Sequence, residues 1–163
     1  MPRYWLDANV LIEAHRRSNP IGIAVSFWAW LATQVEGGII VCPRSVYQEI
    51  AEQEDHRDEV ARWVQNRKEK GLCVPPTREV TAHVGVIMQY VFEKYLPQHA
   101  YEFGKGGDAW VIGHALDDGG TVVTQESELH PDAKKARIPD VCRHFDVRCV
   151  NTVEMLRLLK AKF

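Results

Sequence analysis

One stretch near the start of the chain most constrains what it can fold into: Tyr4-Trp5-Leu6-Asp7-Ala8-Asn9-Val10-Leu11-Ile12. It begins as an apolar, strand-like run, is interrupted by an acid at Asp7, and resumes an apolar face at Val10. An ionised carboxylate is costly to bury unless it is paired or binds a cation, so this acid needs a reason. In an open parallel sheet, ligands bind beyond the carboxyl ends of the strands. We therefore predict that Asp7 ends a buried first strand and points into a functional crevice.

The size and composition of the chain suit one globular domain over residues 1–163. Hydrophobic residues make up 45% and charged residues 26% of the sequence, and the formal net charge is −2. This balance excludes the strongly basic character of proteins that coat nucleic acid non-specifically. The four cysteines form no Cys-x-x-Cys motif, and we find neither a signal peptide nor an apolar run of membrane-spanning length. We therefore expect a reduced, cytoplasmic location and no membrane association.

Short apolar runs alternate with helical patterns along the whole sequence. We predict strands at residues 3–7, 39–42, 121–124 and 147–150, and a short edge strand at 72–74. Helices are predicted at residues 9–16, 23–36, 43–50, 52–70, 77–95, 108–118 and 138–145, and from 152 onward. We take Pro97 to stop the long fifth helix and residues 104–107 to form a loop. Alternation of this kind favours a three-layer α/β/α fold with a central parallel sheet.

Four acids are predicted to meet at one edge of that sheet. Each one closely follows a strand or begins a helix; they are Asp7, Glu49, Asp108 and Glu126. Two like charges 4 Å apart repel by about 4 kcal/mol even at an effective dielectric of 20. Several such pairs would rival the whole stability of a small domain, about 5–15 kcal/mol. If the acids do meet, a cation between them relieves the repulsion, and oxygen ligands favour Mg²⁺ or Mn²⁺.

Each acid also has a simpler interpretation when it is taken alone. Asp108 could be the N-cap of its helix, Glu49 a solvated helix residue and Glu126 a loop acid. A Cys142-x-His144 motif with Cys149 could suggest zinc, but its spacing fits no structural zinc site well. His114 is more simply a packed or capped histidine than a catalytic one.

Four segments together resemble the PIN-domain family, and they span nearly the whole chain. The Asp7-Ala8-Asn9 segment resembles its Asp-x-Asn after the first strand, and the helix from Pro43 resembles its second element, with Glu49 as the acid. The segment starting at Gly107-Asp108 resembles the helix of the third acid. Val122-Val123-Thr124-Gln125-Glu126 resembles the fourth element, a strand followed by Thr-x-Asp. The resemblance implies a PIN-like, Rossmann-like fold.

The resemblance also implies a function. PIN-like proteins are often ribonucleases that depend on Mg²⁺ or Mn²⁺, and many are the toxins of type II toxin–antitoxin pairs. The implied metal ligands and catalytic residues are Asp7, Glu49, Asp108 and Glu126. Asn9 and Thr124 would orient ligands or water, and Lys105 would contact a substrate phosphate. The implied partners are RNA and a cognate antitoxin, with a homodimer as a further option.

The sequence departs from the family pattern at two positions. Ala8 stands where many members have Thr, and Glu126 stands where most have Asp. A second Asp that is common nearby is absent, and Glu128 is the candidate to replace it. Two alternatives therefore stay open. One is a PIN-like RNA- or partner-binding module with weak or no catalysis, and the other is a phosphatase that uses Asp7 as its nucleophile.

Overall fold

A computed structural model of the chain describes residues 2–52, 58–127 and 134–163. Five parallel strands form its central sheet, in the order β3-β2-β1-β4-β5. Their bounds are β1 Tyr4–Leu6, β2 Ile40–Pro43, β3 Cys73–Val74, β4 Thr121–Val123 and β5 Arg148–Val150. The strand β1 lies at the centre, where Tyr4 is in register with Ile40 on one side and with Thr121 on the other. The predicted α/β fold with a parallel sheet is confirmed.

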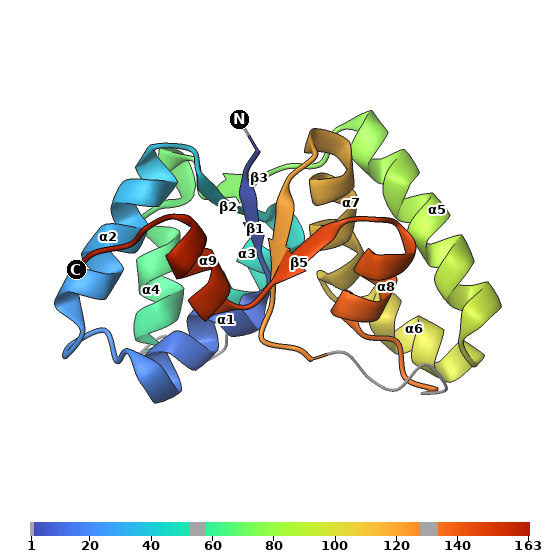
Figure 1. The fold of residues 1–163 in the computed structure, drawn as a ribbon, viewed down its shortest axis with the longest axis horizontal. Coiled ribbons are helices and arrows are strands. Elements are labelled where there is room, and N and C mark those ends of the chain that lie inside the picture. Colours follow the sequence, from blue (N-terminus) through green and yellow to red (C-terminus); the bar gives the residue numbers. More distant parts are fainter. Residues whose placement is uncertain (1, 53–57, 128–133) are drawn as a thin grey trace.

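Helices cover both faces of the sheet (Figure 1). On one side lie α2 (Val25–Glu36), α4 (Glu59–Gln65) and α9 (Thr152–Leu158); on the other lie α5 (Arg78–Lys94), α6 (Pro97–Lys105), α7 (Asp108–Asp118) and α8 (Ile138–His144). The remaining helices are α1 (Ala8–Glu13), which continues as a π-helical turn over Ala14–Ser18, and α3 (Arg44–Ala51). A short 3-10 turn spans Lys68–Lys70. Among the described residues, no helix combines the length and the apolar character needed to cross a membrane.

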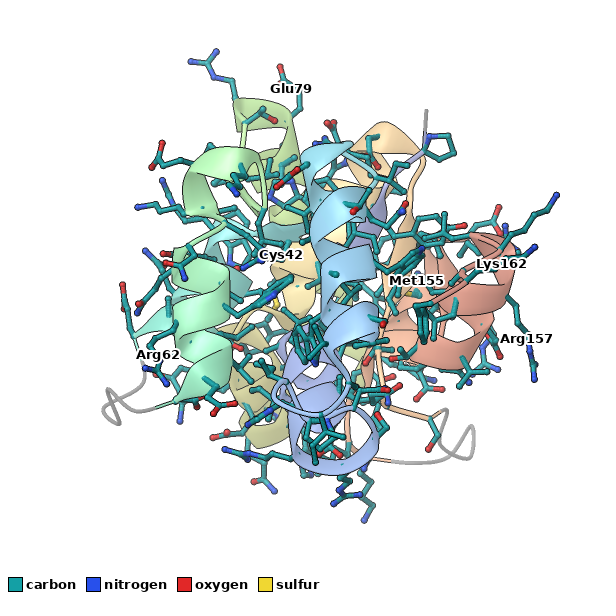
Figure 2. All side chains as sticks on the ribbon, turned by 90° about the vertical axis from the view of Figure 1, so that its left-hand side faces the viewer. Cys42, Arg62, Glu79, Met155, Arg157 and Lys162 are labelled. Carbon is teal, nitrogen blue, oxygen red and sulfur yellow. The ribbon has the colours of Figure 1, made fainter. Side chains whose placement is uncertain are left out.

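The core lies between the sheet and both helical layers. Trp5, Leu6 and Ile40 are almost fully buried strand residues. Figure 2 shows Cys42 and Met155 inside the molecule, whereas Arg62 and Arg157 extend from its periphery; the four cysteines are free. Burial on both faces explains why the central strands β1 and β2 are apolar along their length instead of alternating.

Two predicted elements differ from the structure. Pro97 ends no helix by itself: α5 ends at Lys94, and Pro97 is in the first turn of the additional helix α6. Proline suits a first helical turn because its missing N–H would have no partner there anyway. The single helix predicted over residues 52–70 is also wrong in extent, because the regular part of its described portion is α4, followed by the turn Lys68–Lys70.

The helix α7 is fixed at its carboxyl end by the first strand. The Asp118 carboxylate accepts hydrogen bonds from Arg3 Nε (3.0 Å), Trp5 Nε1 (3.0 Å) and the Gly120 N–H (2.8 Å). Trp5 also stacks on the His114 ring, with centroids 4.3 Å apart. These contacts hold α7 against β1, so the amino end of α7 is carried to the carboxyl edge of the sheet, the lower end in Figure 1.

Candidate functional site

Asp7 lies at the carboxyl end of the central strand and is 4% exposed. It is the N-cap of α1, where its Oδ1 accepts a hydrogen bond from the Ala8 N–H (2.8 Å). Its Oδ2 accepts a second bond from Thr124 Oγ1 (3.0 Å), and Thr124 is itself buried. Burial, and next the charge of Glu126, raise the pKa of Asp7 to about 6 despite these two donors. The carboxylate is therefore held in a fixed orientation and lacks a positive partner strong enough to offset its burial.

Asp108 is the first residue of α7, and the N-cap position belongs to Gly107. The capping role considered for Asp108 is therefore wrong, since no side-chain cap is made there. Burial raises the pKa of Asp108 to about 8, and the charges of Asp7, Glu126 and Glu49 add to this effect in that order. All of these causes disfavour the ionised form, which is the pattern expected where several carboxylates share one space.

Glu49 reaches the same place from α3. Its Oε1 accepts a hydrogen bond of 2.5 Å from the N–H of Gly107, 58 residues further along the chain. Burial raises the pKa of Glu49, and the Gly107 bond opposes this shift. The contact requires glycine: a Cβ at Gly106 would lie 2.7 Å from Glu49 Oε1, and one at Gly107 would lie 2.5 Å from Val46 Cγ2. The Gly106-Gly107 pair thus lets the amino end of α7 pack directly on α3.

Glu126 follows β4 and forms hydrogen bonds with the start of α8 and with Thr124. Its Oε2 accepts a hydrogen bond from the N–H of Ile138 (2.9 Å), at the start of α8. Its own N–H donates to Thr124 Oγ1 (3.1 Å), the same hydroxyl that donates to Asp7. Thr124 therefore couples the positions of two of the predicted site acids.

We refer to Asp7, Glu49, Asp108 and Glu126 together as the acid edge. The charges of Glu126 and Glu49 act on the pKa of both Asp7 and Asp108, so the four side chains lie toward the same edge of the fold, at the carboxyl ends of the strands. No three His, Cys, Asp or Glu side chains of the described chain, however, lie close enough together to form a finished metal cage. Backbone N–H groups donate to Glu49 and to Glu126, and burial, with the charges of nearby acids, raises the pKa of Asp7 to about 6 and that of Asp108 to about 8.

The donor set of the acid edge fits a hard divalent cation. Carboxylate oxygens are the ligands that Mg²⁺ and Mn²⁺ prefer, and a cation would offset the burial and the repulsion that raise the pKa values of Asp7 and Asp108. Asp7, Asp108, Glu49 and Glu126 are the residues that would hold the ion.

Comparison with known families gives one match. A family model described as a domain of unknown function, DUF4411, covers residues 4–163. The chain belongs to the DUF4411 family. Because the match spans almost the whole chain, the acid edge of this DUF4411 protein lies within the family's own domain.

Solved structures place the DUF4411 fold among known ones. The crystal structure of VapBC2 from Rickettsia felis, bound to a DNA fragment from their promoter, is similar with a TM-score of 0.56 and 14% identity, over 91% of this chain and 97% of that chain. The crystal structure of FitAcB from Neisseria gonorrhoeae gives 0.51 and 18%, over 91% and 96%. A comparison with curated proteins finds no significant match. At these identities the similarity establishes the fold, which is PIN-like, and the expected resemblance is confirmed at that level.

The other predicted site residues are Thr124, Asn9 and Lys105, with Glu128 as a candidate replacement for the missing acid. Thr124 contacts Asp7 directly, and Asn9 is an exposed residue of α1. Lys105 is the last residue of α6 instead of a loop residue, and its Nζ pairs with Glu102 (3.0 Å). Its contact with substrate stays a prediction. Glu128 falls outside the described residues.

The zinc alternative in this DUF4411 protein finds no support in the described residues. Cys142 is buried in α8 and Cys149 is on β5. The His144 ring stacks on Tyr90, with centroids 3.6 Å apart. No metal-holding group of His, Cys, Asp or Glu is found among the described residues, so the motif serves packing between α5, α8 and the edge of the sheet.

Sequence reasoning did not find a pocket that adjoins the acid edge. It has a volume of about 200 Å³ and lies between α3 and α7. Its lining residues are Pro43, Arg44, Ser45, Gln48, Pro76, Trp110 and His114. The only sequence signal for it was the basic and hydroxyl pair that follows Pro43 at the start of a helix.

Proposed function

We propose that this protein is a metal-dependent endoribonuclease that hydrolyses RNA phosphodiesters. The observation that carries the proposal is the acid edge: Asp7 and Asp108 have pKa values raised to about 6 and about 8 by burial and by other carboxylates. Strongly perturbed groups at the carboxyl edge of an α/β sheet are characteristic of functional sites. The PIN-like fold supports a nuclease over other acid-containing enzymes.

The residues of the acid edge have distinct parts in the proposed reaction. A bound Mg²⁺ or Mn²⁺ supplies a water of lowered pKa and neutralises charge on the phosphoryl oxygens. Asp7 and Asp108 would bind that ion directly, and Glu49 and Glu126 would join them. Thr124 holds Asp7 through one hydroxyl and fixes the backbone before Glu126. The N–H of Gly107, the residue before Asp108, donates to Glu49 and orients its carboxylate.

We further propose that the protein is the toxin of a type II toxin–antitoxin pair. The similarity of its fold to VapBC2 and FitAcB supports this assignment. The partners would be an RNA substrate and a cognate antitoxin protein, and the toxin could act as a homodimer.

The test is cleavage of a mixed RNA pool by the purified protein in Mg²⁺, in Mn²⁺ and in EDTA. We expect cutting with either metal, none in EDTA, and none by Asp7→Asn in any condition. The matched control is Asp118→Asn, which removes the same charge from the opposite end of α7 and should leave cutting intact. Cutting that persists in EDTA, or that survives Asp7→Asn, would refute a metal-dependent acid site.

A second candidate function is binding without catalysis. The observation that favours it is the incomplete acid edge, in which Glu49 and Glu126 each already accept a backbone hydrogen bond. A binding module would retain RNA affinity and show no turnover in any metal. The phosphatase alternative is weaker, because that chemistry calls for a second Asp two residues after Asp7, and Asn9 stands there instead.

A further inference from the structure

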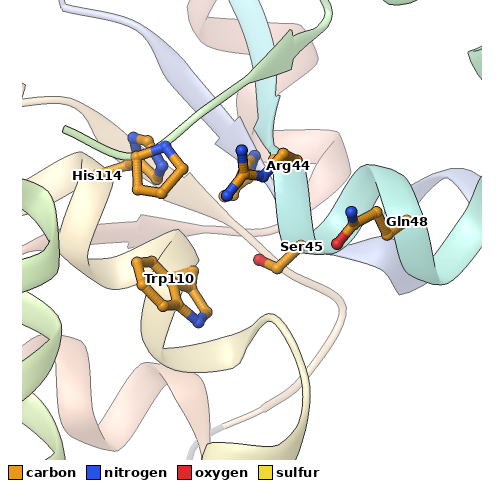
Figure 3. Close-up of a pocket in the computed structure, with 7 residues that line it drawn as sticks. Arg44, Ser45, Gln48, Trp110 and His114 are labelled. Carbon is orange, nitrogen blue, oxygen red and sulfur yellow. The ribbon is translucent and has the colours of Figure 1, made fainter.

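The pocket between α3 and α7 has a chemistry opposite to that of the acid edge beside it. Figure 3 shows Arg44, Ser45 and Gln48 extending from α3 toward Trp110 and His114 of α7. Each polar side chain of this lining can donate a hydrogen bond, and none is a carboxylate. Within the described chain, Arg44 makes no ion pair and its side chain is exposed. The pocket therefore presents hydrogen-bond donors and one positive charge that forms no ion pair in the described part of the chain.

Two buried polar atoms of the lining have no hydrogen-bond partner among the residues that the structure describes. They are His114 Nε2 and Ser45 Oγ. The His114 residue is 3% exposed, so its polar atom cannot be satisfied by bulk water. A buried polar group without a hydrogen-bond partner destabilises the protein, and a ligand that accepts hydrogen bonds would remove that cost. The first turn of α3 begins after Pro43, and no side chain caps it. The backbone N–H groups of this turn can therefore also donate hydrogen bonds to a ligand.

The pocket and the acid edge meet at Gly107. A Cβ built on Gly107 would lie 3.4 Å from Glu49 Oε1 and 3.5 Å from Ser45 Oγ. Glu49 of the acid edge and Ser45 of the pocket therefore both lie next to Gly107. Ser45 and Glu49 are one helical turn apart on α3, and Asp108 and Trp110 share the first turn of α7. The acid edge, which would bind a cation, thus lies beside the pocket, which would bind an anion.

We propose that this pocket binds a phosphate group of the RNA strand, one that flanks the phosphate to be cut. This inference rests on the proposed function. The Arg44 guanidinium, the Ser45 hydroxyl and the Gln48 amide would donate to the phosphate oxygens, with His114 Nε2 as a further donor. Trp110 offers a partly exposed ring on which the attached nucleoside can pack. The pocket would fix the register of the strand, so that the neighbouring phosphodiester lies at the acid edge.

The test measures RNA binding without catalysis. A fluorescent single-stranded RNA is titrated with protein in EDTA over a series of KCl concentrations, and anisotropy reports affinity. For Arg44→Gln we expect about tenfold weaker binding and a salt dependence reduced by about 0.7 in log–log slope, as for the loss of one phosphate contact on a single strand. The matched control is Arg157→Gln on α9, an exposed arginine in the opposite layer (Figure 2), which should change affinity less than about twofold.

A second measurement identifies which atoms take part and which phosphate is bound. In NMR spectra, titration of the RNA should shift the His114 imidazole nitrogens in the wild type, and Ser45→Ala should weaken binding with an unchanged fold. If inorganic phosphate shifts His114 but the RNA does not displace it, the pocket binds free phosphate and the proposal is overturned. Equal affinities of Arg44→Gln and Arg157→Gln would also overturn it.

These outcomes are separable from those of the nuclease assay. If no metal supports cleavage but Arg44→Gln weakens RNA binding, the nuclease assignment fails and the phosphate site stands. If cleavage depends on Asp7 and Arg44→Gln binds as tightly as Arg157→Gln, the phosphate site fails and the nuclease stands.

Discussion

The helix α7 carries an aspartate at each end, and the two lie in opposite electrostatic surroundings. At the carboxyl end, Asp118 accepts hydrogen bonds from Arg3, from Trp5 and from the Gly120 N–H. At the amino end, burial raises the pKa of Asp108 to about 8, and the charges of Asp7, Glu126 and Glu49 add to this effect. The same side chain on the same helix is thus fully partnered at one end and in need of a cation at the other.

The helix dipole alone predicts the reverse. It favours an acid at the amino end and disfavours one at the carboxyl end, by about 0.3–1 kcal/mol each. Specific neighbours outweigh that field, because charge-assisted hydrogen bonds to Asp118 and like charges near Asp108 act at shorter range. The difference teaches that Asp118 completes the fold, whereas Asp108 belongs to a site that the protein alone leaves incomplete.

The largest expected difference between the two ends is in catalysis. Asp108→Asn should reduce metal-dependent RNA cleavage by at least about 100-fold, because a metal ligand supplies several kcal/mol of transition-state stabilisation. Asp118→Asn should retain cleavage within a few-fold when it is assayed well below its unfolding temperature. Initial rates on one RNA in Mn²⁺ give the comparison, and equal losses in both variants would mean that α7 acts only as a scaffold.

The second prediction concerns the pH dependence of stability without metal. Between pH 4 and pH 8, the unfolded chain has already lost the protons that folded Asp7 and Asp108 still hold, since both pKa values are raised. The folded state binds more protons in this window, so its stability falls as pH rises. Asp7 alone, with its pKa moved from 3.8 to about 6, accounts for about 3 kcal/mol across that window.

Urea unfolding in EDTA at pH 5, 6.5 and 8 measures this slope. Asp108→Asn should flatten the upper part of the curve and raise stability at pH 8, while Asp118→Asn should keep the slope. Addition of Mg²⁺ should stabilise the wild type more at pH 8 than at pH 5. A wild type that gains stability from pH 6.5 to pH 8 in EDTA would contradict the proposed repulsion at the acid edge.

The third prediction concerns the hydrogen bonds of Asp118 at the carboxyl end of α7. Asp118→Asn replaces one carboxylate oxygen by an amide NH2 group, which cannot accept a hydrogen bond from Arg3, while the remaining oxygen can still accept from Trp5. The loss of the charge and of the Arg3 bond should lower the free energy of unfolding by about 1–3 kcal/mol. Thermal and urea denaturation measure it, and Asp117→Asn, at the neighbouring position of the same turn, is the matched control with a smaller expected loss.

The smallest expected effect comes from loss of the Thr124 hydroxyl, which orients the Asp7 carboxylate without changing the charge of the acid edge. Thr124→Val removes the hydroxyl that donates to Asp7 and accepts from the Glu126 N–H, so we expect about 1 kcal/mol lower stability and about tenfold weaker Mg²⁺ binding. Thr124→Ser keeps the hydroxyl and should behave as the wild type. Calorimetric titration with Mg²⁺ compares the three proteins; if the valine variant binds the ion as tightly as the serine variant, Thr124 has no positioning role.

The sequence determined the class of fold and the candidate acids. Its apolar runs marked each strand of the parallel sheet, because strands buried on both faces must be apolar along their length. Asp7 and Glu126 were predicted as site residues because each follows the end of a predicted strand, and Asp108 was predicted because it begins a predicted helix. The additional helix α6 was missed because Pro97 is equally compatible with the end of one helix and the first turn of the next.

Only the tertiary structure decided which acids are partnered and which are not. Asp108 and Asp118 are alike in sequence, and their difference depends on residues more than 100 positions away, namely Asp7 near one and Arg3 and Trp5 near the other. The bond from Gly107 to Glu49 and the pocket beneath Arg44 likewise arise from the packing of α7 on α3. Local patterns report burial and turns, whereas electrostatic surroundings are set by long-range neighbours that no local pattern contains.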